Sequence, residues 1–341
     1  MAGLMMRVKT GLLMLGLLAG GVASAEVCTT QSQMTPADRD ALAAAARGLA
    51  AKVQANDVSG LRAATAVEYA KDFGGIGEVV GSTSAHVKSG TLKVEQVYLL
   101  DGTQLKRAAD GSVPDAQFFC SLNKSVAEAD FSISGLAAGR YGFAIVDVTD
   151  GSAPWRLSFL LRQDQGQWVM AGFYPKPLLA AGHDGLWYWT QARLLTAQKE
   201  HWNAWLYYQQ AESLLRPTNF IQSTHLEKLK TEETAAAPPA LSEGISADSP
   251  LVVKGADGAE YHFTALGVDD SLGNDKVDVT AHLKVDQIGD VATARKRNSD
   301  AMNALLAAYP ELRKPFHGVW MFAEVPGQNP FATEQEMSQI H

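Results

Sequence analysis

The chain has 341 residues, of which 46% are hydrophobic, and its 29 Lys and Arg against 37 Asp and Glu give a net charge of −8. This length supports two or three domains with hydrophobic cores. The acidic balance disfavours a nucleic-acid partner, because phosphate binding relies on clustered Lys and Arg. The one basic cluster, residues 294–298, lies in a predicted helix flanked by Asp290 and Asp300, so we interpret it as a solvated helix face.

The first 25 residues have the layout of a secretory signal peptide. Arg7 and Lys9 precede an uncharged apolar run of 12 residues, 11–22, and Ala-Ser-Ala at 23–25 has the A-x-A form of a cleavage site. The run is shorter than the roughly 20 residues that a membrane-spanning helix needs. We therefore expect a mature chain that begins at Glu26, has no membrane span, and is soluble in a periplasm or outside the cell.

The sequence contains two cysteines, Cys28 and Cys120. An even number of cysteines in an exported chain predicts one disulfide. In the chain-entropy model, closing a loop of this length stabilises the folded state by roughly 4 to 5 kcal/mol before any strain is subtracted.

Residues 26–177 are predicted to form an N-terminal α+β domain. Thr35 and Pro36 have the pattern of a helix start, and apolar residues follow at helical spacing up to Val53. A short second helix is expected before the glycine-rich residues 74–81. Two helices are thus followed by a bent antiparallel sheet, with strands near 84–88, 91–100, 116–122, 127–133, 140–149, 154–163 and 167–174.

The order of these elements, together with a final hairpin in which Gly166 is followed by Trp168, gives residues 36–175 a family resemblance. They resemble the cone-shaped, cystatin-like α+β fold shared by ketosteroid isomerase, scytalone dehydratase and nuclear transport factor relatives. The resemblance implies a hydrophobic pocket at the open end of the cone. Because that fold hosts enzymes and pure binders alike, the resemblance transfers no catalytic residue.

Two residues of the strand 140–149 are the candidate catalytic groups. Tyr141 and Asp147 share one strand face, so Asp147 could face an apolar pocket, where burial raises the pKa of a carboxylate toward the range of a general base. Tyr141 could donate a hydrogen bond to a substrate oxygen. Six residues along a strand span roughly 20 Å, however, which is too far for joint action without a bulge. A solvated carboxylate near the turn at Asp150 is the alternative interpretation of Asp147.

Residues 178–232 are predicted to form a helical hairpin that breaks near residues 199–201 and ends at Pro217. Small and large residues alternate in it in a way that resembles one tetratricopeptide hairpin, with the closing proline one place late. A single hairpin cannot bury its apolar face alone. The residues that carry this resemblance are Ala192, Leu195, Ala204, Tyr208 and Ala211.

Four tryptophans in the hairpin have two possible roles. Trp187, Trp189, Trp202 and Trp205 lie within 19 residues of one another. We expect them to pack against a neighbouring domain, because a helix with indoles on a second face needs a second partner. The alternative is a surface on which these indoles bind a ligand or a protein partner.

Residues 233–249 are rich in Ala, Pro, Ser and acids and are predicted to be a linker. Beyond them, residues 250–330 predict a C-terminal βββαβ domain whose sheet has one face in water, because Val277, Val279 and Ala281 alternate with polar residues. We expect residues 331–341 to form a tail beyond this domain.

No motif in the chain predicts a cofactor. Gly75-Ile76-Gly77 begins like a dinucleotide loop but follows a helix and lacks the third glycine. His262 and His282 could form half of a metal site, but no further ligand with suitable spacing completes it, so no metal is predicted.

These observations favour an exported, noncatalytic binding or scaffold protein whose partner is a protein or an apolar small molecule. The alternative is a small isomerase, dehydratase or hydrolase that acts in the cone pocket. Polar groups converging on a cavity would favour the enzyme, whereas a cone filled by its own aromatic residues would disfavour it.

Overall fold

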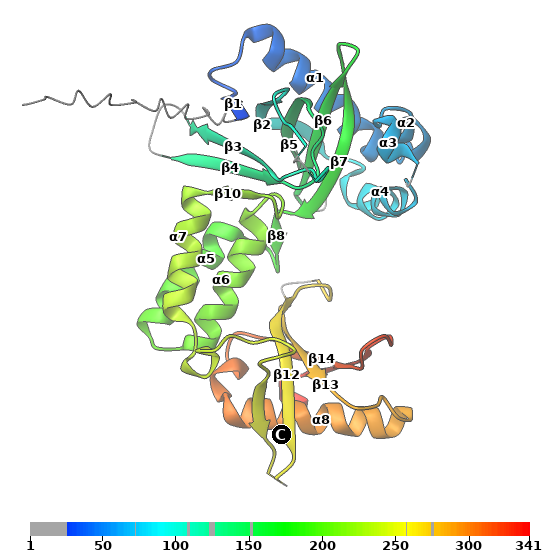
Figure 1. Ribbon diagram of the computed structural model, residues 1–341. Helices are drawn as coiled ribbons and strands as arrows, with labels where there is room; N and C mark the ends of the chain where they lie inside the picture. Colours follow the sequence, from blue (N-terminus) through cyan, green and yellow to red (C-terminus); the bar gives the residue numbers. More distant parts are fainter. Residues whose placement is uncertain are drawn as a thin grey trace, which may run out of the picture.

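The computed structural model describes residues 26–341 except 72, 108–109, 123–126, 151–152, 257 and 274–275. The predicted signal peptide lies outside these described residues. An N-terminal α+β domain, a three-helix module and a C-terminal α+β domain follow one another along the chain and along the length of the molecule (Figure 1). This architecture confirms the predicted α+β fold class.

The N-terminal domain combines four helices with a curved sheet. Helix α1 begins where predicted, because the Thr35 side chain accepts a hydrogen bond from the Asp38 amide and Pro36 occupies the first helical position. All the strands predicted between residues 91 and 174 are present. The elements are β1 (Glu26–Thr30), α1 (Pro36–Gln54), α2 (Val58–Ala63), α3 (Val67–Ala70), α4 (Gly74–Val87), β2 (Thr91–Gly102), β3 (Ala116–Ser121), β4 (Glu128–Ile133), β5 (Gly139–Thr149), β6 (Trp155–Asp164) and β7 (Gln167–Pro177).

The predicted strand at 84–88 is wrong, because these residues belong to helix α4 or follow it directly. Glycine-rich sequence has a low helix propensity, which favoured a loop and a strand at this position. In the structure, Val80 and Val87 lie at helical spacing on the buried side of α4 and pack in the same cluster as residues of α1. Tertiary burial therefore decides the conformation here.

The N-terminal sheet has the strand order β10-β4-β3-β1-β2-β5-β6-β7, in which β10 (Ile221–Ser223) comes from the helical module. Register shifts between Val94 and Gln96 and between Leu160 and Leu161 mark β-bulges, which bend strands and increase their twist. The sheet curls so far that Phe131 on β4 meets Phe143 on β5, with ring centroids 5.5 Å apart, although three strands separate β4 from β5.

Strand β1 is an element that the sequence pattern does not predict. It is five residues long, and Val27 is its one large apolar residue. It pairs with β2 on one side and with β3 on the other. The parallel pairing with β3 brings Cys28 and Cys120 to disulfide distance, with their Cα atoms 5.2 Å apart, as predicted.

Two hydrophobic clusters lie on the two faces of this sheet. On the convex face, the sheet packs against helices α1, α2 and α4. On the concave face, the curled sheet packs against itself. Its interior is filled by fully buried aromatic side chains, namely Phe118, Phe131, Tyr141 and Phe143.

The helical module confirms the predicted hairpin and adds a third helix. The small and aromatic positions of the predicted pattern, Ala192, Ala204, Tyr208 and Ala211, are buried together in its core. Helix α7 runs to Ala236, so the first residues of the predicted linker are helical. The elements are β8 (Leu179–Ala180), β9 (His183–Asp184), α5 (Gly185–Ala197), α6 (His201–Leu215), β10 and α7 (Thr224–Ala236).

The C-terminal domain has the predicted βββαβ order and one further strand. The expectation of a tail at 331–341 is wrong, because residues 331–336 form a strand that pairs with β14. Ile340 near the end of the chain is buried in the domain core. The sequence does not predict this strand because Phe331–Glu336 is largely polar. The elements are β11 (Leu251–Lys254), β12 (Glu260–Asp269), β13 (Asp278–Lys284), α8 (Val291–Ala308), β14 (Gly318–Glu324) and β15 (Phe331–Glu336).

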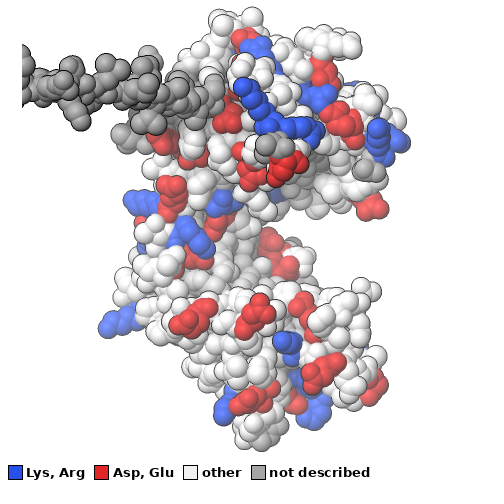
Figure 2. Space-filling view, in the orientation of Figure 1, with Lys and Arg blue, Asp and Glu red and all other residues white. Residues whose placement is uncertain are grey.

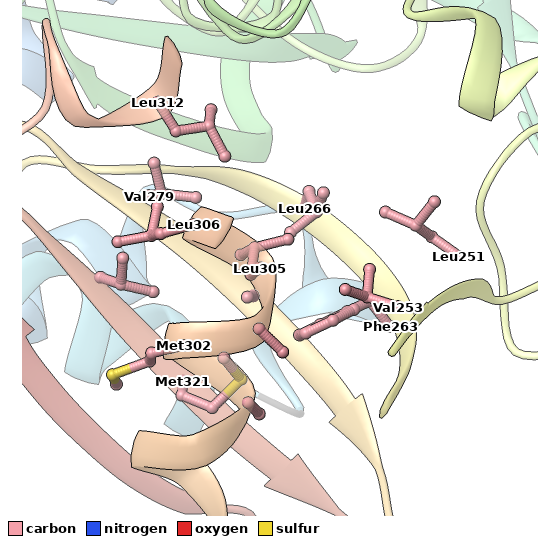
Figure 3. Packing of buried hydrophobic residues seen from close by; sticks show 14 of the residues in the cluster. Leu251, Val253, Phe263, Leu266, Val279, Met302, Leu305, Leu306, Leu312 and Met321 are labelled. Carbon is pink, nitrogen blue, oxygen red and sulfur yellow. The ribbon is translucent and has the colours of Figure 1, made fainter. Parts of the chain in front are cut away.

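The five strands of this domain lie in the order β11-β12-β13-β14-β15, with β13 and β14 parallel and α8 between them in the chain. Helix α8 covers one face. Figure 3 shows Leu305 and Leu306 of α8 against Leu266 and Val279 of the sheet.

Helix α6 packs against two cores at once. One side contributes Ala204 and Tyr208 to the helical module. The other side contributes Trp202, Trp205 and Leu206 to the core of the C-terminal domain. The expectation that the two tryptophans pack against a neighbouring domain is confirmed, since only 5% and 8% of their surfaces are exposed.

We predict that Trp202→Ala lowers the free energy of unfolding by about 3 to 5 kcal/mol, because it removes a large buried side chain and leaves a cavity between two parts of the protein. Leu194→Ala, on the exposed side of α5, is the control and should change it by less than about 0.5 kcal/mol. Urea denaturation measures both. Equal stability of the two variants would contradict the packing role.

Candidate functional site

An apolar pocket of about 370 Å³ lies between the concave face of the N-terminal sheet and the helical module. No Asp, Glu, Lys or Arg is among the described residues that line it. Its volume is at the lower end of the range typical of small-molecule sites. The lining residues are Tyr98, Leu122, Ala129, Ile145, Leu186, Trp189, Leu215, Pro217, Ile221, Ser223, His225 and Leu226.

The helical wall is held in place by a polar network behind Trp189. The indole Nε1 donates a hydrogen bond to Glu232 Oε2 at 2.7 Å, and Arg193 donates two hydrogen bonds to the same carboxylate. The Arg193 guanidinium also lies over the indole, 4.6 Å from the ring centroid. Hydrogen bonding from Arg193 holds the pKa of Glu232 below its ordinary value. Because its N–H is already bonded, Trp189 offers the pocket apolar surface.

The sheet wall consists of side chains on the concave face. Tyr98 and Ile145 point to this face from β2 and β5, next to the aromatic packing that fills the curl. Burial raises the pKa of Tyr98, so its hydroxyl stays protonated at neutral pH. Among the described residues, this hydroxyl has no hydrogen-bond partner.

The first turn of α7 forms the polar end of the pocket. Ser223 caps the helix by accepting a hydrogen bond from the Leu226 amide at 3.3 Å, and His225 follows it. The start of a helix carries a partial positive charge, which favours a polar or anionic group nearby. The pocket is therefore apolar along its walls and polar at one end.

Lys176 fastens the helical module to the sheet beside the pocket. From the end of β7 its Nζ donates to the carbonyl oxygens of Ser213 and Arg216, the latter at 2.5 Å. These carbonyls belong to the C-terminal end of α6. Burial lowers the pKa of Lys176 to about 8, and the charges of Arg156 and Arg216 act in the same direction.

The structure separates the two candidate catalytic residues from the pocket. Asp147 is half of an ion pair in which Arg156 donates two hydrogen bonds, at 2.8 and 2.9 Å. Tyr141 donates a hydrogen bond to the carbonyl oxygen of Ala137 at 2.8 Å, and burial raises its pKa to about 12. They lie at opposite ends of β5 and do not converge on one cavity.

The four hairpin tryptophans have separate surroundings. Trp189 lines the pocket, whereas Trp202 and Trp205 lie in the C-terminal core. Trp187 stacks on His183 with ring centroids 3.7 Å apart. The structure therefore does not bring these indoles together into one aromatic surface.

Sequence reasoning missed the polar end of the pocket. Ser223 precedes Thr224 and Glu227, which are typical of a helix start, and this was a usable signal for α7. Nothing in the sequence places His225 in the same pocket as Tyr98, because strand and helix meet only in the folded chain.

Comparisons of the chain with models of protein families, with curated proteins and with solved structures find no match. The resemblances to the cone-shaped fold and to a tetratricopeptide hairpin therefore stay predictions. None of the helices in the described part of the chain is both long enough and apolar enough to cross a membrane. On the face shown in Figure 2, acidic and basic side chains are interspersed, and the surface is hollowed between the N-terminal and C-terminal domains.

We predict a pH-dependent contribution of Lys176 to stability. Its pKa in the folded protein, about 8, lies below the ordinary value of 10.5, so the folded state binds this proton more weakly than the unfolded chain does. The free energy of unfolding should therefore rise between pH 8 and pH 10 by more in the wild type than in Lys176→Met. Urea denaturation across this range gives the difference, and parallel profiles would contradict the lowered pKa.

Proposed function

We propose that the protein is an exported binding protein that holds an apolar small molecule in the pocket between the N-terminal sheet and the helical module. The observation that carries this proposal is the mainly apolar lining of the pocket, in which aliphatic and aromatic side chains come from both walls and no Asp, Glu, Lys or Arg is present among the described residues. Burying such surface under an apolar ligand is favourable in proportion to its area.

The polar end of the pocket indicates how the ligand lies. Ser223, His225 and the Tyr98 hydroxyl are hydrogen-bonding groups that can orient a polar end of the molecule. The ligand class is therefore an apolar body with one polar or anionic group. The proposed export rests on the sequence of residues 1–25, and the cysteine pair at disulfide distance supports it.

Binding is favoured over the alternative, an enzyme of the isomerase, dehydratase or hydrolase class acting inside the cone. The interior in which such an enzyme would hold its substrate is filled by Phe118, Phe131, Tyr141 and Phe143. The carboxylate of Asp147 is occupied by Arg156. A small molecule is favoured over a protein partner because the apolar lining is gathered into a pocket.

The neutral fluorescent probe N-phenyl-1-naphthylamine tests the proposal. We expect saturable binding of one probe to the wild-type protein, seen as increased emission. Leu186 lies at the rim, 59% exposed, so Leu186→Trp can add bulk at the pocket mouth without disturbing the core. The substitution should weaken probe binding by roughly tenfold, equivalent to about 1.4 kcal/mol.

Leu194→Trp is the matched control. It makes the same change on the same helix at a residue that is 50% exposed and does not line the pocket. Its affinity for the probe should equal that of the wild type. Equal affinities of all three proteins would show that the probe binds elsewhere and would contradict the proposal, as would a wild type that does not bind it.

A further inference from the structure

A second group of chemically suited side chains lies in the C-terminal domain, away from the pocket. Asp278 is the first residue of β13, His317 directly precedes β14, and Glu334 lies on β15. One ligand atom from each of the three residues lies within 4.8 Å of the other two. Because β13, β14 and β15 are neighbours in the sheet, the register of the strands fixes this arrangement.

The backbone around His317 is tied to both flanking strands. Its amide donates a hydrogen bond to the carbonyl oxygen of Val277, and its carbonyl oxygen accepts one from the Met337 amide, both at 2.8 Å. The imidazole is therefore held between the start of β13 and the end of β15. The site is pre-organised by the sheet and does not depend on a flexible loop.

Two carboxylate oxygens at this place are buried without a hydrogen-bond partner among the described residues. The Asp278 side chain is 1% exposed; its Oδ1 lies 3.0 Å from His317 Nδ1, but its Oδ2 has no partner. Glu334 Oε1 is also buried and unpaired. An unpaired, buried carboxylate oxygen is costly unless a cation or a donor compensates it.

Glycine allows these groups to approach the backbone closely. A Cβ atom on Gly318 would lie 2.6 Å from the carbonyl oxygen of Gln335, 3.0 Å from Glu334 Oε1 and 3.1 Å from Asp278 Oδ1. Residue 318 therefore has to be glycine for the two carboxylates to lie this close to the start of β14. Burial and the charge of Asp278 raise the pKa of Glu334, against the smaller opposite effects of His317 and Lys276.

We propose that Asp278, His317 and Glu334 form a binding site for a divalent cation of the zinc class. One imidazole nitrogen and two carboxylate oxygens form a donor set that suits Zn²⁺. Mg²⁺ and Ca²⁺ prefer oxygen ligands alone, so the imidazole favours Zn²⁺ over them. The cation would neutralise two carboxylates that each have one buried oxygen without a hydrogen-bond partner among the described residues.

Glu336 completes the arrangement from the outer side. Its Oε1 lies 3.5 Å from His317 Nε2, where a carboxylate can accept the imidazole proton and leave Nδ1 free to face the metal. Without metal, Nδ1 must carry a proton in order to donate a hydrogen bond to Asp278. Metal binding through Nδ1 therefore requires the imidazole proton to lie on Nε2, facing Glu336.

Calorimetric titration of the chelator-treated, full-length protein with ZnCl₂ at pH 7.5 tests this site. We expect one equivalent of Zn²⁺ to bind and the melting temperature to rise. Asp278→Asn and Glu334→Gln keep the shape of each side chain and should weaken binding by at least about 100-fold, because even outer-shell partners change metal affinity by 10- to 100-fold.

Glu324→Gln is the matched control. Glu324 Oε1 lies 2.7 Å from His282 Nδ1 on the same sheet, so the two form a histidine and carboxylate pair that has no third ligand within the described part of the chain. This variant should bind Zn²⁺ as the wild type does. If the wild type binds no stoichiometric Zn²⁺, or if Asp278→Asn and Glu334→Gln bind it unchanged, the cluster is only an internal ion pair and the proposal is wrong.

Circular dichroism of the metal-free variants checks that they fold. Asp278 is buried, whereas Glu334 is only partly buried. If Asp278→Asn does not fold, Glu334→Gln alone carries the test. Cobalt adds an independent readout, since the visible absorption of bound Co²⁺ should change in His317→Gln if the imidazole is a ligand.

Discussion

Helix α6 is the element on which the arrangement of the whole molecule depends, because each of its ends is bound by a different domain. At its start, the Trp202 amide donates a hydrogen bond to Glu311 of the C-terminal domain at 2.8 Å. At its end, Lys176 of the N-terminal domain binds the last carbonyl oxygens. These contacts satisfy backbone groups that every helix leaves unpaired at its termini. Moving the C-terminal domain away would expose the indoles of Trp202 and Trp205, and moving the N-terminal domain away would leave the last carbonyl oxygens of the helix without their partner Lys176.

The pocket follows from this anchoring. A curled sheet that fills its own interior with aromatic rings leaves further apolar side chains on its concave face, and the helical module covers them incompletely. The wall contributed by Trp189 is stiffened by Glu232 and Arg193, whereas the wall contributed by Ile145 belongs to the sheet itself. A site between two such walls is largely formed before a ligand arrives, which reduces the entropy lost on binding.

The two proposed sites rest on opposite kinds of physical chemistry. In the pocket, apolar surface lies open and lacks charge, so hydrophobic burial supplies the affinity. In the C-terminal domain, two carboxylates each have a buried oxygen without a hydrogen-bond partner among the described residues, so the attraction of a cation would supply the affinity. Figure 1 shows the helical module, which forms one wall of the pocket, between the N-terminal and C-terminal domains.

The sequence by itself determined the elements whose signals are local: the Thr35 cap and Pro36 start of α1, the alternating strands, and the hairpin with Tyr208 between small residues. The pairing of Cys28 with Cys120 followed from the presence of only two cysteines in the sequence. Tertiary structure alone decided the rest. Burial made the glycine-rich residues 74–87 a helix, and strand pairing drew the polar residues 331–336 into a sheet. Both sites are assembled from residues far apart in the chain, such as Tyr98 with His225 and Asp278 with Glu334. Periodicity shows which face a side chain occupies, but only the packed fold fixes which faces meet.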